Sequence, residues 1–306
     1  MKVVIAGGTG FLGRPLAEAL ARDGHDVVSL SRGNAASGAR GARVVSWAPD
    51  GSVGPWAAEI DRATAIVNLA GESIAARRWS AAQKRRIHES RLLATRSLVN
   101  AIRQLRPGPP VFVSGSAVGY YGPLGDEIVA EDHPAGADFL ADVCRAWESE
   151  AMGAQAESRR IVIVRTGLVL ARDGGALPKM LPPFWFGTGG PVGSGRQYWP
   201  WIARSDWVDF VRWAIATPAA DGPFNAVAPE PVTNVQFARA VGRAIHRPAF
   251  MPTPAFALKL ALGEMADALL LTGQRAVPRK ATRLGFTFRY RTLQEALQAI
   301  FDTSRQ

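Results

Sequence analysis

Cysteine is nearly absent from this chain of 306 residues, which has Cys144 alone. A single cysteine excludes an intrachain disulfide framework, so the sequence is compatible with a reducing compartment. The four histidines, His25, His88, His133 and His246, also lack the spacing of a metal site. We therefore expect no metal centre, and we expect Cys144 to be a small buried side chain.

Long apolar runs without charge are lacking as well. The most apolar late stretch, residues 256–271, is interrupted by Lys259, Glu264 and Asp267, which makes it a poor membrane span. We predict an amphipathic packing helix there. The short apolar run at the N-terminus leads directly into a glycine turn, as a strand does and a signal peptide does not. These features predict a cytoplasmic protein without a membrane partner.

Dense runs of one charge are missing, although the formal net charge is +10. The densest basic group is interrupted and helical, and consists of Arg77, Arg78, Lys84, Arg85 and Arg86. No aromatic platform or nucleic-acid recognition module accompanies it. We interpret the charge as solvated surface with some attraction for phosphate, and we expect no nucleic-acid partner.

The start of the chain, MKVVIAGGTGFLGRPLAEAL, carries the clearest signal. Residues 3–6 form the continuous apolar run of a strand buried on both faces. Gly7 allows a tight turn, Gly10 a close approach to a pyrophosphate, and Gly13 close packing of the following helix, whose N-terminus offers free N–H donors. This pattern predicts a dinucleotide-binding turn, with a plain turn as the alternative.

Further strands are predicted near residues 27–30, 44–47, 65–69, 111–114 and 161–165, with helical patterns between several of them. The rhythm is typical of an α/β protein with a Rossmann-type, doubly wound parallel sheet. Ser80 with Gln83 caps the longest helix, and a second helix covers residues 139–151. Capping boxes are also expected at Thr233 and Thr292.

The composition changes after Leu170, where glycine and proline become dense between residues 174 and 195. We therefore predict a nucleotide-binding domain over residues 1–170, its sheet completed by later strands. Residues 171–306 form a smaller, mostly helical, substrate-covering region.

The end of the second strand indicates which cofactor is bound. Ser31 and Arg32 stand where an NAD-preferring fold places an acidic residue on the ribose hydroxyls. Arg32 and Ser31 can instead bind a 2′-phosphate, which favours NADP(H), although Arg32 is alternatively a plain surface residue. A turn of small residues after the fourth strand, Asn68, Leu69, Ala70 and Gly71, would let the cofactor lie against the backbone.

GGTGFLG, NLAG and VSGSAVGYYG resemble the motifs of extended short-chain dehydrogenases/reductases. WSAAQKRRIHESRLLAT, DFLADVCRAWE, VRTGLVLARDGGALPKMLPPF and GQRAVPRKATRLGFTFRY resemble the YfcH-type, epimerase-like branch of atypical members, which has a C-terminal domain of unknown function. The likeness covers essentially the whole chain. It implies NADP(H) bound by Gly7, Thr9, Gly10, Phe11, Leu12 and Gly13, with Arg32 on the phosphate and Arg91, Ser114 and Arg165 as further contacts.

The resemblance also implies a catalytic serine, for which Ser116 is the better match and Ser114 lies nearby. Typical members add a tyrosine and a lysine four residues later, but Phe139 and Val143 stand at these positions and neither can exchange a proton. Candidate substitutes are Tyr120, Tyr121, Glu72 and Lys179. Each also has a plainer reading, as a packed tyrosine, an exposed glutamate or a solvated lysine.

In the segment GSGRQYWPWIARSDWVDFV, Ala203 replaces the histidine of the family pattern, while Asp206 remains and is expected to support the fold or the helix N-terminus. Four aromatic residues, Trp185, Tyr198, Trp199 and Trp201, predict either an aromatic pocket or core packing.

Together these features predict an NADP(H)-dependent oxidoreductase or epimerase-like enzyme acting on a small molecule, either a sugar derivative or a carbonyl compound. The alternative is an NADP(H)-binding sensor or regulatory protein without turnover, because the tyrosine and lysine are missing. Extended members often pair through helices that flank the sheet, so a homodimer is possible.

Overall fold

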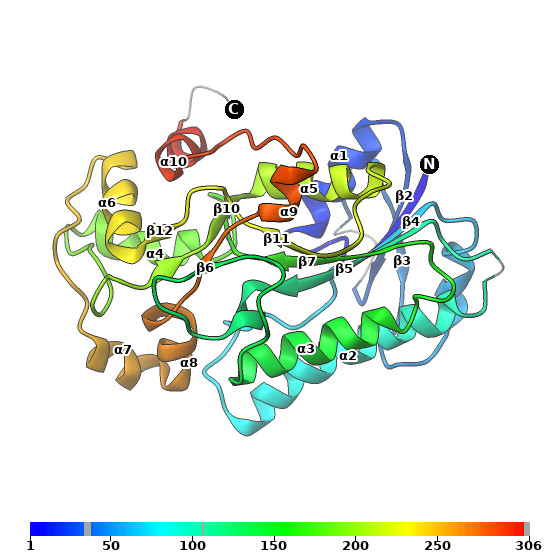
Figure 1. The fold of residues 1–306 in the computed structure, drawn as a ribbon, viewed down its shortest axis with the longest axis horizontal. Helices are drawn as coiled ribbons and strands as arrows, with labels where there is room; N and C mark the ends of the chain where they lie inside the picture. Colours follow the sequence, from blue (N-terminus) through cyan, green and yellow to red (C-terminus); the bar gives the residue numbers. More distant parts are fainter. Residues whose placement is uncertain (34–37, 106, 303–306) are drawn as a thin grey trace.

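A parallel sheet of seven strands forms the centre of the molecule in our computed structural model, which describes residues 1–33, 38–105 and 107–302. The strands are ordered β11-β7-β5-β4-β1-β2-β3 (Figure 1). Their bounds are β1 Lys2–Ala6, β2 Asp26–Ser31, β3 Arg43–Ser46, β4 Ala65–Asn68, β5 Val111–Ala117, β7 Ile161–Thr166 and β11 Gly222–Ala226. This arrangement confirms the predicted Rossmann-type fold, and β11 completes the sheet from beyond residue 170.

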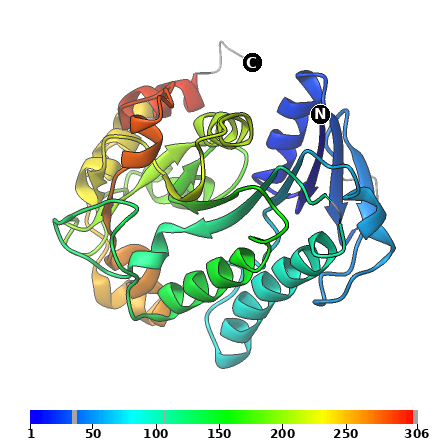
Figure 2. The same ribbon diagram turned by 45° about the vertical axis from the view of Figure 1, so that its right-hand side comes forward.

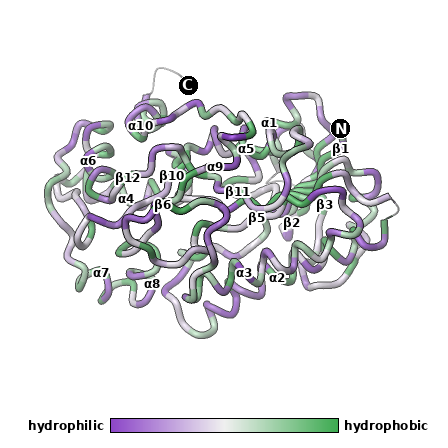
Figure 3. Tube along the Cα trace, viewed as in Figure 1, coloured by the Kyte–Doolittle hydropathy of each residue, from purple (hydrophilic) through white to green (hydrophobic). Residues whose placement is uncertain are grey.

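Alternate residues of the strands face two separate cores. Val3 and Ile5 pack with α1 (Gly13–Arg22) and α5 (Arg204–Ala216), whereas Val4 and Ala6 pack with α2 (Ala81–Ile102). Helix α3 (Phe139–Met152) lies beside α2 below the sheet (Figures 1 and 2). A strand covered on both faces must be apolar throughout, and Figure 3 shows the hydrophobic residues concentrated in these central strands.

The order of the strands reverses at β1, which pairs in parallel with β2 on one side and with β4 on the other. The chain runs outward from β1 through β2 to β3 and then crosses back to β4 on the other side of β1. Ligands of open α/β sheets bind beyond the carboxyl ends of the strands at such a point. The fold thus places the glycine turn, which follows β1, at the natural binding edge.

The predicted helix starts are confirmed in detail. The Ser80 side chain accepts the Gln83 N–H, and Thr233 and Thr292 form full capping boxes with Gln236 and Glu295. Each cap satisfies amides that would otherwise lack an acceptor at the helix N-terminus.

A smaller lobe lies against the carboxyl edge of the sheet. Its strands form three two-stranded pairs: β6 (Ile128–Val129) with β13 (Arg275–Ala276), β8 (Leu168–Leu170) with β10 (Trp201–Ala203), and β9 (Tyr198–Trp199) with β12 (Val232–Thr233). Its helices are α4 Leu177–Trp185, α6 Asn234–Ala244, α7 Ala255–Leu262, α8 Glu264–Ala266 and α10 Leu293–Phe301. Short helical turns complete the chain at η2 Pro55–Glu59, η3 Val118–Tyr121, η4 Asp267–Leu271 and α9 Arg279–Arg283. Helix α10 packs on α6 around a third core.

The prediction of one amphipathic packing helix over residues 256–271 is wrong. The segment is divided into α7, α8 and η4, and Gly263, with φ of +63°, interrupts it because this left-handed conformation cannot continue a right-handed helix. No residue of α7 is buried. Within the described ranges, no helix is both long and apolar enough to cross a membrane.

Candidate functional site

A cavity of about 600 Å³ lies between the carboxyl ends of the central strands and the smaller lobe. The glycine turn, the ends of β4, β5 and β7, and one face of α3 line it from the sheet side. Residues of β8, α4, β9 and η4 line it from the lobe. The cavity therefore lies at the edge where the topology places a ligand.

Two glycines of the turn are sterically required. A Cβ atom at Gly13 would lie 2.2 Å from the carbonyl oxygen of Gly7, and Gly7 itself has φ of +78°. No side chain or carbonyl in the described part of the chain accepts the amides of Phe11, Leu12 and Gly13. The residues that carry these free N–H donors line the cavity at the start of α1, where an anionic group would satisfy them.

Arg91 brings a positive charge to the same cavity. It extends from α2, donates to the carbonyls of Glu72 and Ile87, and stacks 5.2 Å from the Trp147 ring centre. Burial lowers the pKa of its guanidinium. No carboxylate among the described residues forms an ion pair with it, and the nearby charge of Glu72 opposes the lowering of its pKa only in part. The cavity thus holds a partly desolvated cation as well as free amides. A diphosphate fits this donor set.

Asn68 fixes the turn after β4. Its buried side-chain amide donates to the Thr95 hydroxyl at 2.8 Å, and its oxygen accepts the Ala70 N–H at 3.2 Å. Leu69 and Gly71 then face the cavity, and a Cβ at Gly71 would approach Arg91 at 3.1 Å. Glu72 lines the cavity next to them.

The end of β2 lies beside the glycine turn rather than in the cavity wall. The Ser31 and Thr9 hydroxyl oxygens are 3.1 Å apart, and Ser31 also accepts the Gly33 N–H. Arg32 is exposed there. Its side chain is thus available to a group that extends outward past Thr9.

Ser116 is the one residue of the predicted catalytic group on β5 that faces the cavity. Its hydroxyl donates to the Glu148 carboxylate of α3 at 2.6 Å, and Arg165 binds both Glu148 oxygens at 2.9 Å. The sequence analysis missed Glu148. Ser116 and Glu148 are 32 residues apart, so no local spacing marks the pair.

The buried Arg165 and Tyr121 form a cluster with the half-buried Tyr120, and none of the three lines the cavity. The Arg165 guanidinium lies 3.5 Å from the Tyr120 ring centre and donates to the Tyr121 hydroxyl. Tyr121 in turn donates to Asn225 at 2.7 Å, and burial raises the pKa of its hydroxyl to about 12. These contacts tie β7, α3 and η3 together behind Ser116.

The other candidates are dispersed. Lys179 is exposed, whereas Met180 beside it faces the cavity, and Ser114 is fully buried within β5. Phe139 packs on Trp79, and Val143 lines the cavity with Cys144, whose thiol pKa burial raises to about 11. The structure thus puts no proton-exchanging side chain at either of the two α3 positions.

The four aromatic residues also separate. Tyr198 and Trp199 line the cavity. Trp201 is buried in the lobe core, where its indole donates to the Glu230 carbonyl, while Trp185 is 56% exposed. Asp206 lies outside the cavity and accepts the amides of Arg289 and Tyr290.

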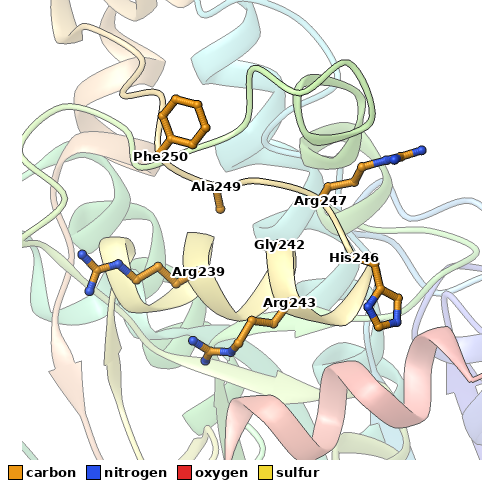
Figure 4. A pocket seen from close by; sticks show the side chains of 7 residues that line it. All are labelled: Arg239, Gly242, Arg243, His246, Arg247, Ala249 and Phe250. Atoms are coloured by element: carbon orange, nitrogen blue, oxygen red, sulfur yellow. The ribbon is translucent and has the colours of Figure 1, made fainter.

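A second hollow lies on α6 and the segment after it (Figure 4). Arg239, Arg243 and Arg247 border it, but the Arg247 side chain extends away from those of Arg239 and Arg243. An anion site requires donors that converge on one point. We therefore place the candidate site in the cavity at the sheet edge.

The reversed strand order, the glycine turn and the cavity at the carboxyl edge define a nucleotide-binding protein of the Rossmann class. The sequence model of the NAD dependent epimerase/dehydratase family matches residues 3–227, and that of a domain of unknown function, DUF1731, matches residues 253–300. The chain therefore belongs to the NAD dependent epimerase/dehydratase family.

Sequence similarity to known proteins extends over almost the whole chain. The epimerase family protein ML0860 of Mycobacterium leprae is 41% identical over 96% of this chain and 94% of its own length. The human epimerase family protein SDR39U1 is 35% identical over 98% of this chain and 99% of its own length.

Solved structures agree with this assignment. Human SDR39U1 (isoform 2), crystallised with NADPH, has a TM-score of 0.89 at 34% identity and covers 99% of this chain and 100% of its own. A nucleoside-diphosphate sugar epimerase of Corynebacterium glutamicum has a TM-score of 0.77 at 32% identity, over 100% of this chain and 60% of its own.

Proposed function

We propose that this protein binds NADP(H) at the sheet edge and acts as an NADP(H)-dependent oxidoreductase or epimerase-like enzyme on a small molecule. The observation that carries the proposal is the half-buried Arg91 guanidinium, which forms no ion pair among the described residues, in the same cavity as the free amides of Phe11, Leu12 and Gly13. The NADPH bound to human SDR39U1 supports the choice of cofactor.

The residues fit the cofactor in three places. The amides at the start of α1 and Arg91 would hold the diphosphate, and the backbone of Leu69 and Gly71 would lie along the ribose. The exposed Arg32, with Ser31, would bind the 2′-phosphate beyond Thr9. A bound nicotinamide would supply hydride transfer, and Ser116 is the polar group of β5 that would face the substrate.

The absence of a proton-exchanging pair on α3 favours a second candidate function. Phe139 packs against Trp79 and Val143 is apolar, so neither side chain transfers a proton. A protein with an intact cofactor site and no such pair could sense NADP(H) instead of turning it over.

The choice of cofactor is tested by titrating NADPH and NADH against the tryptophan fluorescence of the protein. We expect NADPH to bind at least tenfold more tightly, and Arg32→Ala to remove this preference by deleting the charge-assisted bonds to the 2′-phosphate. Arg62→Ala, with its side chain 92% exposed, is the matched control. Equal affinities for NADPH and NADH in the unmodified protein would contradict the role of Arg32.

Turnover separates the two functions. Oxidation of NADPH in the presence of a panel of carbonyl compounds, lost in Ser116→Ala while NADPH binding is retained, would support the enzyme. Tight NADPH binding with no turnover on any member of the panel would support the sensor.

A further inference from the structure

The cavity has few charged lining residues. In the described part of the chain they are Glu72, in the segment after β4, and Arg91, on α2. Trp147 stacks on Arg91 and Gly175 lies against Phe11 of the glycine turn. The rest of the lining from Gly115 onward, which we call the substrate end, has no aspartate, glutamate, lysine, arginine or histidine. Its wall is largely apolar and includes Val118, Leu140, Val143, Leu168, Met180 and Leu269.

Several polar groups of the substrate end are already engaged within the protein. The Thr166 hydroxyl accepts the Trp207 indole N–H, and the Thr272 hydroxyl donates to the Asp267 carbonyl. The Gln274 amide donates to the Gly122 carbonyl at 2.7 Å. A strongly polar ligand would find few free partners here, and burying it without partners is unfavourable.

Arg275 lies behind Tyr198 and outside the lining of the cavity. Its guanidinium stacks 5.1 Å from the ring centre of Tyr198 and donates to the Asp126 carbonyl at 3.4 Å, while its buried Nε has no hydrogen-bond partner among the described residues. The residue is absent from the lining, although Tyr198, Gly273 and Gln274 around it are present. The diphosphate of a nucleotide sugar therefore has no cationic side chain to receive it at the substrate end.

The hydrogen bonds of Ser116 determine which kind of ligand group can bind to it. The Ser116 hydroxyl donates to one carboxylate oxygen of Glu148, and Arg165 donates to both oxygens of the same group. The Ser116 oxygen then offers only lone pairs to the cavity. A ligand that meets it must bring its own hydrogen-bond donor, as a hydroxyl group does.

We propose that the substrate is an uncharged, largely apolar small molecule with a hydroxyl group that donates to Ser116, and not a nucleoside-diphosphate sugar. The proposal deepens the proposed function, on which it rests for placing the substrate beside the cofactor. Apolar surface of such a molecule is buried against the lining of the substrate end, and its hydroxyl finds the free oxygen there.

The test is calorimetric titration of the NADPH-loaded protein with three probes: 2-(2-naphthyl)ethanol, 2-naphthylacetate and UDP-glucose. The first two are close in shape and differ in charge. We expect the alcohol to bind at least tenfold more tightly than the carboxylate, and UDP-glucose to bind no more tightly than the carboxylate. UDP-glucose or naphthylacetate binding as tightly as the alcohol would overturn the proposal.

A gain of function provides a second, independent comparison. Leu269→Arg places a cation in the substrate end and should raise the affinity for 2-naphthylacetate at least tenfold. Leu260→Arg, on the exposed helix α7 and 78% exposed in the native chain, should leave it unchanged. Equal effects of the two variants count against the proposal, and the three-probe comparison on the unmodified chain stands if Leu269→Arg does not fold.

Failure of the proposed cofactor site can be distinguished from failure of the substrate proposal. NADPH binding is measured by fluorescence on the same samples before each titration, and its absence would refute the cofactor site alone. The three probes are then titrated into the cofactor-free protein, where preference for the alcohol still supports the uncharged substrate end and preference for UDP-glucose overturns it.

Discussion

Arg91 is held at an energetic cost, because desolvation disfavours a cation that forms no ion pair among the described residues and whose charge Glu72 offsets only in part. We expect Arg91→Met to weaken NADPH binding by about 10- to 100-fold, the range for loss of charge-assisted hydrogen bonds of roughly 1.5–3 kcal/mol. Quenching of tryptophan fluorescence by NADPH measures the change.

Arg85→Met is the control, since Arg85 is exposed on the same helix. Melting temperatures of both variants establish that they are folded. An unchanged NADPH affinity in folded Arg91→Met would remove Arg91 from the cofactor site.

Tyr121 stabilises the fold in its neutral form. Burial raises its pKa from 10.0 to about 12, so its contribution is present below pH 10 and is lost as the pH rises towards 12. We expect the free energy of unfolding to fall by on the order of 1 kcal/mol between pH 9 and pH 11 from this group. Urea unfolding at the two pH values measures it.

Tyr121→Phe should be less stable at pH 9, because Asn225 and Arg165 each lose a partner, and should show a smaller fall towards pH 11. The same fall in both proteins would mean that Tyr121 is not the titrating group. A hydroxyl this difficult to ionise is poorly suited to proton transfer at neutral pH.

The contact between the glycine turn and α1 can be tested at the scale of the element. In Gly13→Ala the new Cβ would lie 2.2 Å from the Gly7 oxygen, so α1 must move away from the turn. We expect a loss of about 1–3 kcal/mol in stability and at least tenfold in NADPH affinity. Gly125→Ala is the control, because no atom lies within 4 Å of its added Cβ. Chemical unfolding and NADPH titration of both variants check the result.

Elements whose signals are local in the sequence could be predicted. The apolar run of β1, the glycine turn and the caps at Ser80, Thr233 and Thr292 each depend on residues a few positions apart. The structure of residues 256–271 could not be predicted, because their apolar content indicated burial. Whether a neighbouring element covers α7 depends on the tertiary fold, and none buries it.

Some residues of the candidate site could also be predicted from local sequence, and others could not. The glycine turn could be located from spacing alone, whereas the Ser116–Glu148 contact joins β5 to α3 across 32 residues. Arg165, which family resemblance assigned to the cofactor, forms its ion pair with Glu148 behind the cavity. A single sequence does not reveal which of several arginines pairs with which carboxylate, because that pairing is set by packing.

At the scale of the whole molecule, the C-terminal segment is part of the nucleotide-binding fold. Phe286 packs against Phe210 and Trp213 of α5, in the core that contains β1. The Lys280 amide donates to the Glu131 carboxylate, and β13 pairs with β6. Since residues from the lobe and from the sheet line one cavity, we infer that the lobe and sheet unfold together.

Asp206 provides the test of this coupling. It is fully buried at the start of α5, and its two oxygens accept the amides of Arg289 at 2.8 Å and Tyr290 at 3.1 Å. In Asp206→Asn one side-chain oxygen can still accept an amide N–H, but an NH₂ group now faces the other amide, and two donors cannot bond to each other. We therefore expect a loss of about 1–3 kcal/mol in the free energy of unfolding. Asp142→Asn, at an exposed ion pair on α3, should change it by less than about 0.5 kcal/mol.

If the lobe is coupled to the sheet, thermal unfolding of Asp206→Asn keeps a single transition at a lower temperature. A separate early transition for the C-terminal segment would instead mean that the segment folds independently of the sheet.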